Sequence, residues 1–297
     1  MHTPQVPSPA RPVARAAALT LALGAALAAT ATAHAETLVG LSGPNSLVRF
    51  DSATPGTLAT PVAITGLAAG ENVLAIDLRP TTGVLYGLTS ANSVYSFTAG
   101  GAATFVGSLS APLTSGVVGI DFNPAADLSG ATSLRIVSGS GQNYAFNVAT
   151  GATVVATGVQ TGFASVAYAN NDLSPATATS LYYIDSAADV LKVAAGNFNG
   201  APAPVPITSV GALGVNFGDV GGFDISASGA AFASNGNSLY SVNLATGAAS
   251  LIGAFGGNAS VSGLTAVTAP IPEPSTYALM LAGLLGLGCM AKRRARV

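Results

Sequence analysis

Short runs of alternating apolar and polar residues, rich in β-branched side chains, fill the chain between residues 36 and 270. Turns rich in Gly, Asn and Pro separate these runs, and strong helical periodicity is missing from the stretch. Alternation with a period of two is typical of strands that bury one face. The pattern therefore predicts an all-β domain, and about 235 residues suffice for one sizeable core.

One strand-like run recurs five times along this stretch. Its copies are VLAIDLRP (73–80), VVGIDFNP (117–124), FASVAYAN (163–170), GGFDISAS (221–228) and VSGLTAV (261–267). Two further sets follow in a fixed order, first LVGLS, VLYGLT, LRIVSG, LYYID and AAFAS, then SLVRFD, SVYSFT, NYAFNV, DVLKVA and SLYSVN. A turn and a fourth run complete each unit. The near-duplicate turns NVATGAT and NLATGAA are typical of hairpins.

The spacing of the repeat indicates the architecture. Residues 77, 121, 167, 224 and 265 occupy one position of it, at intervals of 44, 46, 57 and 41 residues. The longest interval contains GNFNGAPAPVPI, which we interpret as a loop insertion. Four strands every ~40–45 residues are typical of β-propeller blades. We therefore expect a β-propeller-like fold of about five four-stranded blades.

The repeat is out of phase with the ends of the stretch. It begins at the second strand of a blade, Leu38–Ser42, while a spare first strand, Val261–Val267, lies at the other end. Left unpaired, both would be exposed sheet edges. We predict that these two segments pair and close the ring.

The recurring pattern IDLRP…LYGL…VYSF…ATFVGSL resembles propeller-like domains of secreted bacterial proteins. It is most similar to the family catalogued as domain of unknown function 4394, over nearly all of residues 36–268. The motifs of this family are structural, so the resemblance implies the fold and brings no activity with it.

The last residues of the chain have three parts with different physical properties. A proline-rich linker at 269–274 ends in Pro272, Glu273 and Pro274, and its rings favour an extended backbone. The segment 275–297 begins with an uncharged run of roughly 25 Å if helical, short of the ~30 Å hydrocarbon core of a bilayer. It ends in a basic stop, expected to stay cytoplasmic, of Lys292, Arg293, Arg294 and Arg296.

These three parts, in this order, resemble the PEP-CTERM sorting signal of Gram-negative bacteria. The resemblance implies an exosortase-type processing enzyme as a partner, in bacteria that make exopolysaccharide or biofilm matrix. We expect export through the inner membrane to the cell surface or beyond, with a transient or residual membrane anchor in the tail. An ordinary C-terminal anchor is the alternative.

The N-terminal residues 1–35 have the pattern of a secretory signal peptide. Arg11 and Arg15 precede an Ala-rich apolar run, and Ala33-His34-Ala35 is a small-residue cleavage site. We expect signal peptidase to cut there and the mature chain to begin at Glu36. An uncleaved helix is the alternative, although the run is short.

Composition excludes several classes of function for residues 36–270. Four basic and eleven acidic side chains give this stretch a formal charge of −7, so a nucleic-acid partner is not expected. Both histidines lie in the first 35 residues and the one cysteine lies in the tail. Ser–His–Asp and Cys–His nucleophiles, zinc, haem and iron–sulfur sites all lose their usual ligands.

Carboxylates are the best remaining chemical candidates. Asp77, Asp121 and Asp224 share one repeat position, on the strand predicted to be innermost in its blade. Pointing into a central channel, they could hold Ca²⁺ or act as a paired acid and base on a glycoside. We favour a third interpretation, in which each aspartate ends a strand and caps the following turn.

We therefore expect an exported, non-catalytic surface or matrix protein that binds exopolysaccharide or another surface protein and needs no cofactor. The alternative is a polysaccharide hydrolase or lyase that uses the aspartates of the channel. Against this alternative, the chain has no tryptophan to form a sugar platform, and residues 36–270 contain two glutamates.

Overall fold

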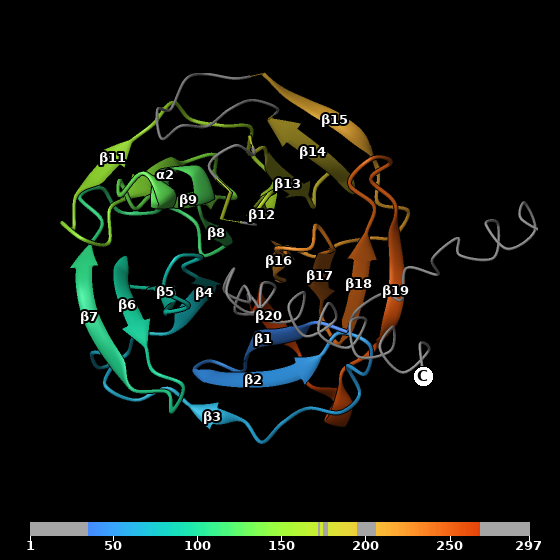
Figure 1. Ribbon diagram of the computed structural model, residues 1–297, viewed down its shortest axis with the longest axis horizontal. Coiled ribbons are helices and arrows are strands. Elements are labelled where there is room, and N and C mark those ends of the chain that lie inside the picture. The colour runs from blue at the N-terminus through green and yellow to red at the C-terminus, as the bar shows by residue number, and fades with distance from the viewer. Residues whose placement is uncertain (1–34, 172, 175–177, 195–205, 268–297) are drawn as a thin grey trace, which may run out of the picture. The chain divides into compact units, whose positions relative to one another are not determined.

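The computed structural model describes residues 35–171, 173–174, 178–194 and 206–267. In these residues twenty strands form five four-stranded antiparallel sheets, arranged around a common axis as the blades of a propeller (Figure 1). The all-β fold and its five blades are as predicted. Helix is limited here to α2 (Pro124–Leu128) and one turn of 3₁₀-helix at Gly256–Asn258.

The blades are given with their strands from the axis outwards. Blade 1 contains β20 (Val261–Ala266), β1 (Thr37–Ser42), β2 (Ser46–Asp51) and β3 (Val62–Ala63). Blade 2 contains β4 (Val73–Leu78), β5 (Leu85–Thr89), β6 (Ser93–Phe97) and β7 (Ala103–Ser108). Blade 3 contains β8 (Val118–Phe122), β9 (Leu134–Ser138), β10 (Asn143–Phe146) and β11 (Thr153–Val155). Blade 4 contains β12 (Phe163–Tyr168), β13 (Leu181–Asp185), β14 (Val190–Ala194) and β15 (Ile207–Ala212). Blade 5 contains β16 (Phe223–Ile225), β17 (Ala231–Asn235), β18 (Ser238–Val242) and β19 (Ala249–Ala254).

The duplicated turns join the third and fourth strands of blades 3 and 5. The side-chain oxygen of Asn147 accepts hydrogen bonds from the backbone N–H groups of residues 149 and 150, and Asn243 does the same for residues 245 and 246. Gly151 and Gly247 then adopt positive φ angles of 72° and 84°. Each turn thus uses the Asn and Gly chemistry expected of it.

The ring closes through blade 1, where the last described strand pairs with the first. Antiparallel β20 and β1 pair from Leu38 opposite Ala266 to Ser42 opposite Val261. Beyond this ladder the Val267 N–H donates to the Thr37 carbonyl over 2.8 Å. The predicted closure is confirmed, and neither strand is left without a partner.

The hydrophobic core is divided among the five interfaces between neighbouring blades, which we call seams. One cluster of buried side chains fills each seam. In the seam between blades 2 and 3, for example, Leu88 packs with Phe122 and Phe146. Because each blade contributes to two seams, removing one blade would expose apolar surface on both of its neighbours.

Small residues let the inner strands approach closely at the axis. These residues lie two positions before the shared repeat position, at Ala75, Gly119, Ser165, Gly222 and Gly263. A Cβ added to Gly222 would lie 2.2 Å from the Leu264 nitrogen. The cavity enclosed there is about 10 Å³, no more than one water molecule needs. This end of the axis is packed rather than open.

Contacts divide the chain into two units, residues 1–35 and 36–297. The boundary coincides with the predicted cleavage site between Ala35 and Glu36, and the cleavage itself stays a prediction. Glu36 is hydrogen-bonded to the domain: its N–H donates to Ser52 Oγ, and its carboxylate accepts from Ser226 and Ser228. The signal peptide, with Ala33, and the tail from 268 onwards lie outside the described residues. So does most of the insertion. No helix in the described parts is both long and apolar enough to span a membrane.

Candidate functional site

The first candidate site lies on the propeller axis, at one shared position of the five inner strands. We call this the axial position; its residues are Asp77, Asp121, Ala167, Asp224 and Thr265. Each aspartate offers an oxygen within 4.8 Å of those of the other two. Their exposed fractions are 5%, 1% and 3%. The structure thus brings the three sequence-predicted carboxylates together and buries them.

Each polar side chain of the axial position links its blade to the next one around the ring. Asp77 accepts the Phe122 N–H over 2.7 Å, and Asp121 accepts the backbone N–H of Tyr168. Asp224 accepts the Ala266 N–H over 2.6 Å. The aspartates therefore stabilise contacts between blades rather than cap the turns after their own strands, which corrects the interpretation favoured from sequence.

Thr265 completes the link between blades 1 and 2. Its hydroxyl accepts the Leu78 N–H over 3.2 Å and donates to Asp77 over 2.9 Å. A hydroxyl can donate and accept at once. Thr265 therefore accepts a backbone N–H of the next blade, as the aspartates do, and also donates a hydrogen bond to the Asp77 carboxyl group.

Ala167 interrupts the series, because a methyl group cannot accept a hydrogen bond. The Ile225 N–H of the next blade donates instead to Asp224, the residue before it, over 2.6 Å. Two other bonds join blades 4 and 5: Asn171 donates to the Ile225 carbonyl over 2.9 Å, and Ser165 donates to the Gly221 carbonyl over 3.1 Å. Hydrogen bonds from Ser165 and Asn171 thus join blades 4 and 5 in place of one from the axial position.

Burial raises the pKa of all three carboxyl groups. The pKa of Asp77 is well above its usual value because of burial and the charge on Asp224, against the hydrogen bonds it accepts. Burial, followed by the charges on Asp77 and Asp224, does the same to the pKa of Asp121. Burial raises the pKa of Asp224 to about 6. Burial and mutual repulsion therefore make each of the three carboxyl groups hold its proton to a higher pH than an exposed aspartate does.

The geometry of the three aspartates also bears on the two other interpretations, a Ca²⁺ site and acid–base catalysis on a glycoside. Oxygens within 4.8 Å of one another could belong to one cation, but Ca²⁺ takes six to eight oxygen ligands. In this cluster the Asp77 and Asp224 oxygens already accept hydrogen bonds. Acid–base work on a polysaccharide needs a carboxylate within reach of the substrate, whereas these are nearly inaccessible.

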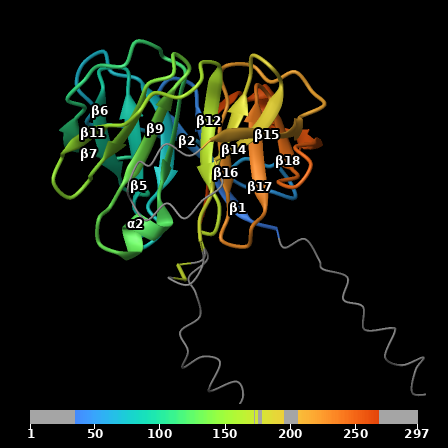
Figure 2. The ribbon, with the colours of Figure 1, turned by 90° about the horizontal axis from the view of Figure 1, so that it is seen from above.

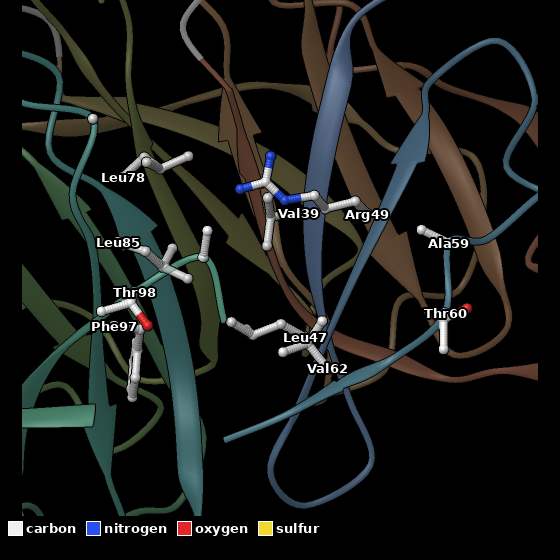
Figure 3. Close-up of a pocket in the computed structure, with 12 residues that line it drawn as sticks. Val39, Leu47, Arg49, Ala59, Thr60, Val62, Leu78, Leu85, Phe97 and Thr98 are labelled. Atoms are coloured by element: carbon white, nitrogen blue, oxygen red, sulfur yellow. The ribbon is translucent and has the colours of Figure 1, made fainter. Parts of the chain in front are cut away.

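The second candidate site is a pocket of about 200 Å³ in the seam between blades 1 and 2. We call it the seam pocket. Buried apolar side chains form its floor, at Val39, Leu47, Leu85 and Phe97. Figure 3 shows side chains of the two blades facing each other across it, with Leu47 and Val62 opposite Leu85 and Phe97.

A difference between the seams explains why the pocket forms here. In four seams a side chain of the second strand shares a contact or a buried cluster with one of the next inner strand. Tyr86 packs on Phe122 and Arg135 donates to Tyr168, while Tyr182 shares a cluster with Ile225 and Phe232 shares one with Ala266. Each of these pairs includes an aromatic ring. In the fifth seam the pair is Val39 and Leu78, which line the pocket. Neither position supplies a ring to fill the space.

One cation lies at the mouth of the pocket. Figure 3 shows the exposed Arg49 side chain reaching from β2 across β1, with its guanidinium over Val39 and toward Leu78. It makes no ion pair or hydrogen bond with any residue that the structure describes.

The other basic side chains of the described domain are engaged. Arg79 pairs with Asp127 of α2, which lies at one edge of the blades in Figure 2, over 2.7 Å. Lys192 pairs with Asp185 over 2.9 Å, and Arg135 donates to Asn143 over 2.9 Å.

Sequence reasoning missed the seam pocket, although a signal was present. In the second repeated run, one position is Tyr86, Arg135, Tyr182 or Phe232 in four copies and Val39 in the other; it follows Leu85, Leu134, Leu181, Ala231 and Leu38, respectively. Opposite Val39 in the ladder stands Arg49, where the other blades have Ser96, Ala145, Val193 and Ser241. Both departures from the repeat fall in one blade.

Comparison with known proteins gives two family matches. The model described as domain of unknown function (DUF4394) matches residues 46–265, and a PEP-CTERM protein-sorting motif matches residues 270–295. No curated protein matches the chain.

The solved structures that match this chain are distant in sequence. One chain of a nidogen/laminin complex is 12% identical with a TM-score of 0.50, covering 79% of this chain and 99% of that one. A protein of unknown function from Bacteroides thetaiotaomicron is 13% identical with a TM-score of 0.46, covering 74% of this chain and 58% of that one. A calcium-binding protein, regucalcin, from Agrobacterium tumefaciens is 13% identical with a TM-score of 0.45, covering 75% and 74%. At these identities the likeness concerns the fold alone.

Proposed function

The chain belongs to the DUF4394 family and ends in a PEP-CTERM sorting motif, and from this premise we propose an exported surface or matrix protein that catalyses no reaction. The motif implies export, handling by an exosortase-type enzyme, and a surface or extracellular location. On this proposal the propeller is a structural or binding module whose partner is exopolysaccharide or another surface protein.

The observation that carries the proposal is the state of the axial carboxylates. They are the chemical candidates shared by several blades, and each accepts a backbone N–H from the next blade. Their exposed fractions do not exceed 5%, so a polysaccharide chain has no route to them in this conformation. A polar cluster used in this way supports architecture rather than turnover.

A binding and cleavage assay tests the role of the propeller. The exported protein is incubated with exopolysaccharide from its own host, and bound protein and newly formed reducing or unsaturated ends are measured together. Binding without new chain ends is the expected result. Asp121→Asn, which keeps the shape of the side chain, serves as the matched variant. Cleavage by the wild-type protein that disappears in this variant would establish the hydrolase or lyase instead.

Mass spectrometry of the surface form tests the export half of the proposal. We expect Glu36 at the N-terminus and loss of the basic stop at Lys292, Arg293, Arg294 and Arg296 from the C-terminus. Recovery of an intact Arg296 in the surface form would identify the tail as an ordinary anchor.

A further inference from the structure

We propose that the seam pocket binds a small acid: one ring-sized apolar group carrying a carboxylate that pairs with Arg49. This inference goes beyond the proposed function and does not depend on it, because the pocket shares no residue with the axial position.

The size of the pocket sets the size of the ligand. Its volume is about 200 Å³. An apolar protein cavity of about 150 Å³ accommodates benzene, whereas drug-sized ligands occupy roughly 300 Å³ or more. One six-membered ring with one substituent therefore fits, and an extended oligosaccharide does not.

The floor of the pocket determines the polarity of the buried group. The side chains of Val39, Leu47 and Leu85 offer no hydrogen-bond partner, and each is at most 8% exposed. The polar side chains that line the pocket are Arg49, Thr60 and Thr98. Sugar hydroxyl groups that face the apolar floor would lose water without replacement, which is unfavourable. An aromatic or alicyclic ring would instead gain the apolar contacts that Tyr86 and Phe232 supply in their own seams.

Arg49 determines the charge of the ligand. A guanidinium presents paired N–H donors that match a carboxylate, and here no described acidic residue uses them. Blades 2 to 5 have Ser96, Ala145, Val193 and Ser241 at this position, so the repeat does not require a cation for folding. The arginine and the missing ring occur at neighbouring ladder positions, Arg49 opposite Val39, and so face the same pocket.

Titration of the full chain with benzoate, followed by calorimetry and ligand-observed NMR, tests the proposal. We expect saturable binding of one benzoate per chain with a dissociation constant of about 1 mM or tighter. Benzamide keeps the ring and removes the charge, and glucuronate keeps the carboxylate and makes the ring polar. The dissociation constant of each should be at least roughly tenfold higher than that of benzoate, because each compound lacks one of the two matched features.

Two variants locate the site. Arg49→Ser installs the residue of blades 2 and 5 and should weaken benzoate binding about tenfold or more. Val39→Tyr installs the residue of blades 2 and 4 and should abolish binding by filling the pocket. Its melting temperature should stay equal or rise, which separates a filled pocket from a misfolded protein.

Ser241→Ala, at the matching position of blade 5, is the control and should bind like the wild type. The proposal fails if benzoate shows no saturable binding at concentrations about tenfold above the expected constant. It also fails if Val39→Tyr binds benzoate as well as the wild type does, since the ligand would then lie elsewhere.

Discussion

The axis and the seam pocket differ in how their charged side chains are buried and hydrogen-bonded. At the axis, carboxylates are buried, close together and hydrogen-bonded to neighbouring blades. In the seam pocket the Arg49 side chain is exposed, and its guanidinium forms no ion pair or hydrogen bond with the described residues. The aspartates recur with the repeat, whereas Arg49 and Val39 depart from it. In a repeat protein, side chains that follow the repeat are explained by architecture, and those that break it are the better candidates for recognition.

The largest effect that distinguishes the two regions should come from removing the inner strand of blade 1. Deletion of Val261–Ala266 leaves the inner edge of β1 without a partner strand and removes Thr265 from the axis. We expect loss of cooperative unfolding in urea, that is, of the whole stability of a domain, on the order of 5–15 kcal/mol. A chain ending at Val267 is the control and should unfold as the full chain does. Cooperative unfolding of the deletion variant would contradict the closed ring.

A smaller effect is expected from turning a filled seam into an open one. Tyr86 packs edge-on against Phe122 with ring centroids 5.2 Å apart. Tyr86→Val reproduces the Val39 seam between blades 2 and 3 and should cost about 2 kcal/mol in urea unfolding. The new cavity would have Ser96, not an arginine, at its mouth. Benzoate binding to this second seam, as tight as to the first, would show that the ring-sized space and not the cation determines recognition.

The pH dependence of stability should report on the axis alone. The folded chain holds the protons of Asp77, Asp121 and Asp224 more tightly than the unfolded chain, whose aspartates titrate near pH 4. The stability that this contributes is complete below about pH 4 and is lost as the pH rises through about 6, the pKa of Asp224, and beyond.

Asp121→Asn removes one of the three titrating groups from the axis. Its urea midpoint should equal that of the wild type at pH 4 and exceed it at pH 8, since a neutral amide adds no charge to the cluster. If the urea midpoint of the variant changed with pH just as that of the wild type does, the titrating groups would lie outside the axial cluster.

The smallest effect, none beyond the measurement error, is expected from calcium. We predict that about 5 mM Ca²⁺, above the dissociation constants of extracellular calcium modules, leaves the melting temperature unchanged. A chelator should not lower it either. The reason is that the three carboxyl groups are buried and already accept backbone N–H groups of the neighbouring blades. A calcium-dependent rise that vanishes in Asp121→Asn would instead identify a cation site at the axis.

The sequence predicted the fold well because the relevant signals are local or repeated. Period-two alternation marks the strands, Asn147 and Asn243 mark matching turns, and the phase of the repeat predicts that the ends share a blade. The pairing of Val261–Ala266 with Thr37–Ser42 follows from this phase alone. The shared position of the three aspartates was visible for the same reason.

What these aspartates do could not be predicted from their positions along the chain. Whether an aspartate caps its own turn or reaches the next blade depends on how closely the inner strands approach. Glycines set this distance: a Cβ at Gly119 would lie 2.6 Å from the Val166 nitrogen. The seam pocket was hidden for a related reason, because it joins Val39 and Leu78, which are neighbours only after blades 1 and 2 have packed together.

The closure of blade 1 also sets the order in which the molecule can be completed during export. The Ser262 hydroxyl donates to the carbonyl of Leu41, 221 residues earlier, so most of the chain must arrive before this contact forms. A chain that emerges from its N-terminus delivers β1 first and β20 last of all the strands. The sorting motif at residues 270–295 follows β20 in the chain. The ring therefore cannot close before β20 has emerged, and the sorting motif follows β20 within a few residues.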